Sequence, residues 1–405
     1  MDSRPKGRLN RLFKPFETKA INLRNPGYAF LCLVLMGLLT ACERSASTIR
    51  SQVQVETRPF HTPTQPQATP SPNQDHVTIP QTRSPVLPTA TQSLPREYPV
   101  RSIPLSGPIT STGAEISGMA WFGDEMLILL PQYPEKFGDG AYGAVFALPK
   151  SQILGYLEGE TQTPIQPVEI PFDDAGFSTS IPGYEGFESI AISGNSVYLT
   201  IESSPGEMVG YLVSGQISLG LESIRLASNR QTAIPPQASL KNYSDEALLA
   251  FGDRLVSIFE LNGAALNPDP VAHLFDLALQ LQDTLAFPAI EYRITDATPP
   301  DEFGRFWAIN YFFPGDADLK PTSDPIQEMY GEGFTHTRSD AVERLIELQF
   351  SETGIVLSDS APIQLELLSG DQARNWEAIS RLDGLGFLLA SDRYPDTILG
   401  FVQYP

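Results

Sequence analysis

A hairpin motif that recurs along residues 98–405 limits the possible folds of this chain more than any other feature. Residues 187–202 align without a gap with residues 245–260, and each copy places one acid fourteen residues before another. Both copies join two β-forming runs through Gly-Asn or Gly-Asp, dipeptides that supply the positive φ of a tight hairpin turn. Further copies, the second of them weaker, occupy residues 116–129, 294–310 and 376–392. The sequence therefore predicts repeated antiparallel β units.

Five such units of four strands describe an all-β protein, a five-bladed β-propeller. The last unit begins near Asn375 and has room for only three strands. We therefore expect residues 98–105 to supply its missing outer strand and to close the ring. A six-bladed ring stays open as an alternative, because residues 290–375 are long enough to contain a second blade.

The repeated acids predict a shared central site. In a propeller the innermost strand of every blade starts at the same face, beside the central channel. Carboxylates gathered there repel one another unless they are protonated or bridged by a cation, and calcium accepts such oxygen ligands. The expected calcium ligands are the strand-start acids Glu188, Glu246, Asp296 and Glu377. The alternative is that each acid accepts hydrogen bonds from backbone N–H groups of the next blade. Such an acid would be a structural pin, a side chain that only holds two blades together.

A long insert in the fourth repeat, residues 314–340, carries Lys320, His336 and Arg338, and Arg393 lies on an equivalent loop. We expect these four side chains to meet a small anionic substrate on the same face. Zinc is disfavoured, because residues 98–405 contain two histidines and no cysteine. A Ser-His-Asp hydrolase is disfavoured as well, since no Gly-x-Ser-x-Gly elbow is present. The sequence singles out no catalytic residue.

Two inner-strand motifs carry a family resemblance. Residues 187–191 (Phe-Glu-Ser-Ile-Ala) and 375–379 (Asn-Trp-Glu-Ala-Ile), with residues 389–393 (Leu-Ala-Ser-Asp-Arg), resemble the esterase-like phytase group of bacterial β-propeller proteins. In that group aromatic-Glu-Gly-(Leu/Ile)-Ala leads into a strand that ends in Ser-Asp-(Asn/Arg). This chain has Ser189 and Ala378 at the glycine position. The resemblance implies a metal-supported phosphoester or ester hydrolase with Glu188 and Glu377 as channel acids.

The N-terminal segment carries a second resemblance. A basic stretch precedes a short apolar run that ends in Leu-Thr-Ala-Cys at residues 39–42, which resembles the lipobox of bacterial lipoproteins. The run is too short to span a bilayer but suits a signal-peptide core. The resemblance implies that residues 1–41 are removed and that the Cys42 thiol is acylated. The protein would then be anchored by lipid to the cell membrane or the outer membrane, facing away from the cytoplasm. The alternative is a buried core helix of a cytosolic domain.

Residues 42–97 are rich in Pro, Thr, Ser and Gln, which predicts a disordered tether between the anchor and a propeller head at residues 98–405. The net charge of −21 repels nucleic acid, so we expect no nucleic-acid partner. It also repels bare phosphoesters, so an anionic substrate requires a bound cation.

Two hypotheses therefore stand. The first is a calcium-dependent phosphoester or ester hydrolase. The second is a non-catalytic propeller that binds a protein or glycan partner on the same face, with calcium structural or absent.

Overall fold

The structure is a computed structural model that describes residues 94–405, apart from positions 141, 239, 371 and 393–396. These residues belong to one compact unit, Leu87–Pro405, called the head below. The predicted signal peptide, Cys42, nearly all of the predicted tether and Arg393 lie outside the described residues. None of the helices in the described part of the chain has the length and apolar character to cross a bilayer.

Consecutive strands of the head pair antiparallel in groups of four. The first group is β3 (Ile116–Phe122), β4 (Met126–Pro131), β5 (Gly143–Pro149) and β6 (Val168–Asp173). The second is β7 (Tyr184–Ser193), β8 (Ser196–Ser203), β9 (Gly210–Ile217) and β10 (Ile224–Ile234). The third is β11 (Asp245–Phe251), β12 (Arg254–Phe259), β13 (Val271–Asp276) and β14 (Leu281–Ala286).

The remaining strands continue this pattern and bring the N-terminal strands of the head beside them. Strands β15 (Arg293–Ala297), β16 (Arg305–Phe312), β17 (Val342–Ser351) and β18 (Gly354–Leu357) pair in order. Strand β19 (Ile363–Leu365) pairs with β17 and, in parallel, with β1 (Glu97–Tyr98). The last group is β20 (Trp376–Leu382), β21 (Gly386–Ser391), β22 (Leu399–Gln403) and β2 (Arg101–Ile103).

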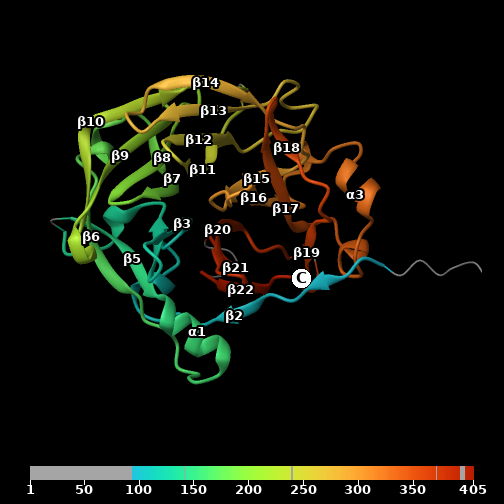
Figure 1. Ribbon diagram of the computed structural model, residues 1–405, viewed down its shortest axis with the longest axis horizontal. Helices are drawn as coiled ribbons and strands as arrows, with labels where there is room; N and C mark the ends of the chain where they lie inside the picture. Colours follow the sequence, from blue (N-terminus) through green and yellow to red (C-terminus); the bar gives the residue numbers. More distant parts are fainter. Residues whose placement is uncertain (1–93, 141, 239, 371, 393–396) are drawn as a thin grey trace, which may run out of the picture. The chain divides into compact units, whose positions relative to one another are not determined.

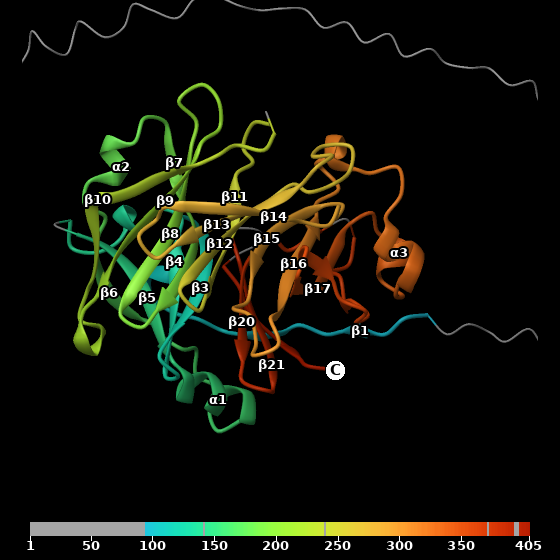
Figure 2. The same ribbon diagram turned by 45° about the horizontal axis from the view of Figure 1, so that its top comes forward.

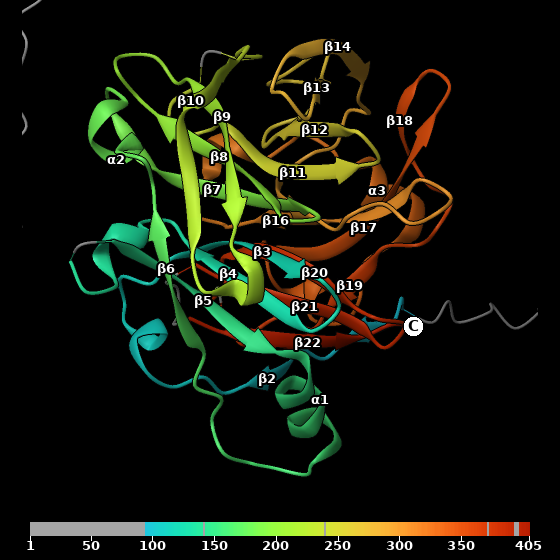
Figure 3. The same ribbon diagram turned by 60° about the vertical axis from the view of Figure 1, so that its left-hand side comes forward.

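Each predicted hairpin repeat is confirmed by the pairing of an innermost strand with the strand that follows it. The turn glycines have the positive φ that the sequence requires, for example 58° at Gly194 and 61° at Gly252. The prediction that residues 98–105 contribute a strand to the last group is also confirmed, because Arg101 lies opposite Phe401 in the β2–β22 pair. Figure 3 shows these two strands beside β21.

The groups fan out from a common centre. The innermost strands β3, β7, β11, β15 and β20 each contact the next around a closed circle, with β20 returning to β3. Figure 1 shows these strands around the centre and the later strands of each group farther out, and Figure 2 shows the same groups from an inclined direction. The head therefore has a β-propeller-like fold.

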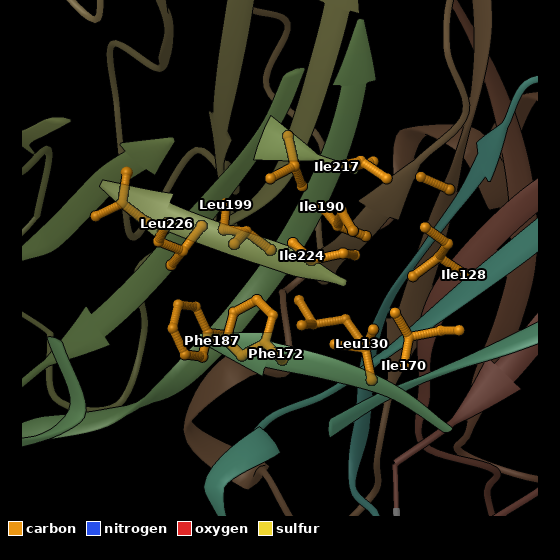
Figure 4. Packing of buried hydrophobic residues seen from close by; sticks show 14 of the residues in the cluster. Ile128, Leu130, Ile170, Phe172, Phe187, Ile190, Leu199, Ile217, Ile224 and Leu226 are labelled. Atoms are coloured by element: carbon orange, nitrogen blue, oxygen red, sulfur yellow. The ribbon is translucent and has the colours of Figure 1, made fainter. Parts of the chain in front are cut away.

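Apolar packing lies between neighbouring groups rather than at the centre. Figure 4 shows one such layer, in which Leu130 and Ile170 of the first group lie near Ile190 and Leu199 of the second. All of these side chains are buried. Because the cores between the groups bury the apolar faces of the sheets, the centre of the circle is available for polar side chains.

Helices are few and short in the part of the chain that the structure describes. They are α1 (Lys150–Glu158), α2 (Phe177–Ser180) and α3 (Pro325–Tyr330), with 3-10 turns η1 (Pro108–Thr110), η2 (Pro134–Lys136), η3 (Leu219–Leu221), η4 (Ala317–Leu319) and η5 (His336–Arg338). The predicted substrate insert contains η4, α3 and η5. Its helix α3 lies at the periphery of the head in Figure 1, not over the centre, because Ile326 is buried in the core beside β16 and β17.

Candidate functional site

A β-bulge at the start of four of the five inner strands turns one side chain out of the sheet ladder. The register shifts at Ser117, Glu188, Glu246 and Glu377, which fall at the same place in their hairpins. A bulge leaves one residue unpaired and re-aims its side chain. The repeat in the sequence is thus a repeated bulge, and it brings these side chains to one central cavity.

This central cavity has a volume of about 160 Å³, enough for several water molecules. It contains three of the four predicted metal ligands together with Glu202 of the returning strand β8 and Asp392, which directly follows β21. Its lining residues are Glu115, Ile116, Ser117, Gln132, Glu188, Glu202, Asn242, Glu246, Arg293, Asn375, Glu377 and Asp392.

Arg293, at the start of β15, lines the cavity and was not predicted from the sequence. Its Nε donates to Glu260, and its Nη2 lies 3.2 Å from Glu377 Oε1 and 3.7 Å from Glu246 Oε1. The Asn310 side chain donates to the backbone carbonyl of Arg293 at 3.2 Å and so holds the start of the strand. A guanidinium of the chain itself therefore lies where a bound cation was expected.

Asp296 lies elsewhere, which corrects its prediction as a channel ligand. Its carboxylate accepts the Ile379 backbone N–H at 2.8 Å, just as the Ser189 hydroxyl accepts the Leu248 N–H at 3.1 Å. Asp296 therefore occupies the position in its inner strand that Ser189 occupies in β7, which is one residue after the position of Glu188. The structural-pin alternative describes what Asp296 does: it fastens β15 to β20, and burial raises its pKa.

Burial raises the pKa of five glutamates at the cavity, Glu188, Glu202, Glu246, Glu260 and Glu377. Burial is the main cause for Glu202, aided by the charge of Glu260, and together they raise its pKa to about 8. Burial raises the pKa of Glu377 to about 8 even though Arg293 opposes the change. The pKa of Glu188 rises well above 4.5 for the same reason, with Glu202 as the largest neighbouring charge. Near neutral pH the cavity can therefore both donate and accept protons.

The carboxyl groups are not all satisfied within the protein. Glu188 Oε1 accepts from Gln132 Nε2 at 2.9 Å. Glu202 Oε1 and Glu246 Oε2 are buried and have no hydrogen-bond partner among the described residues. Such oxygens are costly to bury unless a proton or a ligand meets them.

The predicted substrate-binding cations do not gather at the cavity. Lys320 pairs with Asp340 at 3.0 Å on the surface. The Arg338 guanidinium lies 3.5 Å above the Phe334 ring. Neither side chain lines the cavity, and Arg393 lies outside the described residues.

His336, the remaining residue of that prediction, is buried at the edge of the head. Its Nδ1 lies 2.8 Å from a carboxylate oxygen of Glu97, and its backbone N–H also donates to that oxygen. Glu97, the last residue of the predicted tether, forms the start of β1. These contacts hold the first strand of the head against η5, so His336 has a structural partner there.

The donor set fits a metal poorly where the sequence predicted one. Among the described residues, no three His, Cys, Asp or Glu side chains are grouped as a metal site. Calcium takes six to eight oxygens at about 2.3–2.6 Å, whereas Arg293 lies among Glu246, Glu260 and Glu377. The calcium site stays a prediction, with Glu188 and Glu202 as the acids that Arg293 leaves unpaired.

No protein-family model and no curated protein match this chain. Among solved structures it is similar to a family-43 glycoside hydrolase (TM-score 0.41, 11% identity, covering 75% of this chain and 96% of the other). It is also similar to the Escherichia coli soluble aldose sugar dehydrogenase, with a TM-score of 0.38 and 9% identity over 75% of this chain and 99% of the other. A third similar structure is Kuenenia stuttgartiensis hydrazine synthase, with a TM-score of 0.34 and 10% identity. The match covers 68% of this chain and 61% of that chain. Since each TM-score is below 0.5, we take the fold from the strand pairings alone.

Proposed function

We propose that this chain is an extracytoplasmic lipoprotein whose head, a five-bladed β-propeller, binds a glycan in its central cavity. The Leu-Thr-Ala-Cys motif supports acylation of Cys42 and removal of residues 1–41. The pairings support five blades, because residues 290–375 supply one group of four strands plus β19, which pairs with β17 and β1.

The polarity of the cavity carries the glycan proposal. Carboxylates accept hydrogen bonds from sugar hydroxyl groups. The side-chain amides of Gln132, Asn242 and Asn375 add both hydrogen-bond donors and acceptors. A bare phosphate or carboxylate is disfavoured, since the charge of Arg293 is already matched by Glu260 and Glu377. A polyhydroxylated ligand without negative charge avoids this repulsion and satisfies buried acceptors.

The test is calorimetric titration of the full chain in detergent with a panel of mono- and oligosaccharides. We expect saturable one-site binding that Glu188→Gln weakens at least tenfold, because Gln keeps the shape but loses one charged acceptor. Glu352→Gln is the matched control, because it makes the same substitution at an exposed turn. It should bind the saccharide as tightly as the wild type does. Absence of binding across the panel, or equal weakening by both variants, would reject this function.

A calcium-dependent phosphoester or ester hydrolase is the second candidate. One observation favours it: Glu188 and Glu202 have no ion pair with a cationic side chain of the described residues, and they face the same cavity. Calcium bound there would polarise a substrate oxygen, lower the pKa of a bound water and offset the negative field. Chromogenic phosphate and carboxylate esters, assayed with calcium and with chelator, test it. Hydrolysis rates that equal the uncatalysed background both with calcium and with chelator would exclude this candidate.

A further inference from the structure

The charge of the central cavity is unbalanced. Six carboxyl groups line it, and Arg293 is the one cationic lining residue that the described part of the chain supplies. Glu115 has its own partner, Lys136, at 3.1 Å. Arg293 is engaged with Glu246, Glu260 and Glu377. Glu188 and Glu202, on the other side of the cavity, therefore have no ion-pairing cation among the described residues, and their charge is offset either by retained protons or by a cationic ligand.

An unsatisfied oxygen points to a ligand on that side. Glu202 is 9% exposed, yet its Oε1 lacks a hydrogen-bond partner in the described structure. Glu202 lines the cavity together with Glu188. A ligand that brings hydrogen-bond donors and positive charge removes both penalties at once.

An ammonium group fits this geometry better than a metal ion. An ammonium has three donors that reach oxygens at about 2.7–2.9 Å, and it needs no closed shell of six ligands. The rim of the cavity already holds one such group: the Lys136 ammonium lies between Glu115 and the Tyr133 ring, 3.8 Å from the ring centroid. The cavity volume of about 160 Å³ suits a single ring-sized group.

We infer that the glycan bound in the central cavity carries a free primary ammonium, that is, an amino sugar, and that this ammonium donates to Glu188 and Glu202. The inference rests on the glycan function proposed above. N-acetylation removes the charge and adds bulk, so an acetamido sugar lacks the decisive contact. A plain hexose has the hydroxyl groups without the ammonium.

The experiment compares D-glucosamine, N-acetyl-D-glucosamine, D-glucose and ethylamine, with calcium titrated separately, by calorimetry on the full chain at pH 6.5, where both amines are protonated. We expect D-glucosamine to bind at least tenfold more tightly than each of the others. Glu202→Gln and Glu188→Gln should each remove most of this preference, and Glu352→Gln should leave it intact. Two cavity variants are used so that a folding defect in one does not decide the result.

The possible failures are distinct. Equal affinity for all three sugars would overturn the ammonium inference and leave the glycan function standing. Equal affinity for D-glucosamine and ethylamine would uphold the ammonium site and refute the glycan function. Calcium that binds more tightly than D-glucosamine, and is lost in Glu202→Gln, would overturn the inference in favour of a metal. Binding by none of the four compounds would overturn both proposals.

Discussion

Replacing Glu202 with Gln should stabilise the head at alkaline pH and leave it nearly unchanged at acidic pH. Burial and the charge of Glu260 raise the folded-state pKa of Glu202 from 4.5 to about 8. A raised carboxyl pKa means that the folded state binds the proton more tightly than the unfolded state. Its stabilising contribution is therefore complete below pH 4.5 and is lost as the pH rises towards 8. Gln has no such proton, so the variant escapes this loss.

The size of the effect follows from the pKa values. One pKa unit corresponds to ~1.4 kcal/mol, so the rise from 4.5 to about 8 sets an upper limit of ~5 kcal/mol on the alkaline difference. The nearby acids titrate in the same range, and a proton removed from one is partly retained by another. We therefore expect Glu202→Gln to exceed the wild type by roughly 2 kcal/mol in unfolding free energy at pH 8.5.

Urea unfolding at pH 4.5 and pH 8.5, followed by tryptophan fluorescence, measures this difference. Trp376 is fully buried in the last group of strands and so reports loss of packing there. Glu352→Gln removes an equal charge from an exposed turn and should show no difference at either pH. A Glu202→Gln variant that gains nothing at pH 8.5, or gains equally at both pH values, would refute the reasoning about burial.

Three further predictions concern the same site. Arg293→Met leaves Glu260 buried without its cation, so urea unfolding at pH 7 should show a free energy of unfolding lower by about 3–5 kcal/mol. A smaller loss at pH 5 would show that a proton on Glu260 replaces the charge of the guanidinium. Asp296→Ala should cost about 1–3 kcal/mol because the Ile379 N–H loses its acceptor, while calorimetry should show ligand binding unchanged; Asp296→Asn should recover most of the stability. D-glucosamine binding should weaken as the pH falls from 7 to 5, a range in which its amino group stays protonated, since a protonated Glu202 cannot pair with an ammonium; pH-independent affinity in the calorimeter would contradict this.

The sequence predicts the hairpins and the pairing of β2 with β22 because both depend on local signals. Turn glycines such as Gly194 and alternating apolar residues specify each antiparallel pair without knowledge of the rest of the chain. The missing outer strand followed from counting, since a unit that ends after three strands needs a fourth from elsewhere.

The site was harder to predict because a one-residue difference in a bulge decides where a side chain lies. The bulge in β15 spans two residues, Thr295 and Asp296, whereas the bulge in β7 holds Glu188 alone. An alignment by residue type therefore matched Asp296 to Glu188 and passed over Arg293. His336 could not be assigned either, because its partner Glu97 is more than 200 residues away in the chain.

The bulges, the buried acids and Arg293 together link ligand binding to pH. Because the repeated bulges place several carboxyl groups in one small cavity, their charge must be offset from within or from outside. Arg293 offsets part of it for Glu260 and Glu377, and retained protons offset more, as the raised pKa of Glu202 shows. A cationic ligand competes with those protons, so its binding must release them. Proton release on ligand binding, detected as calorimetric heats that depend on the buffer, therefore follows from the same charge imbalance that shapes the cavity.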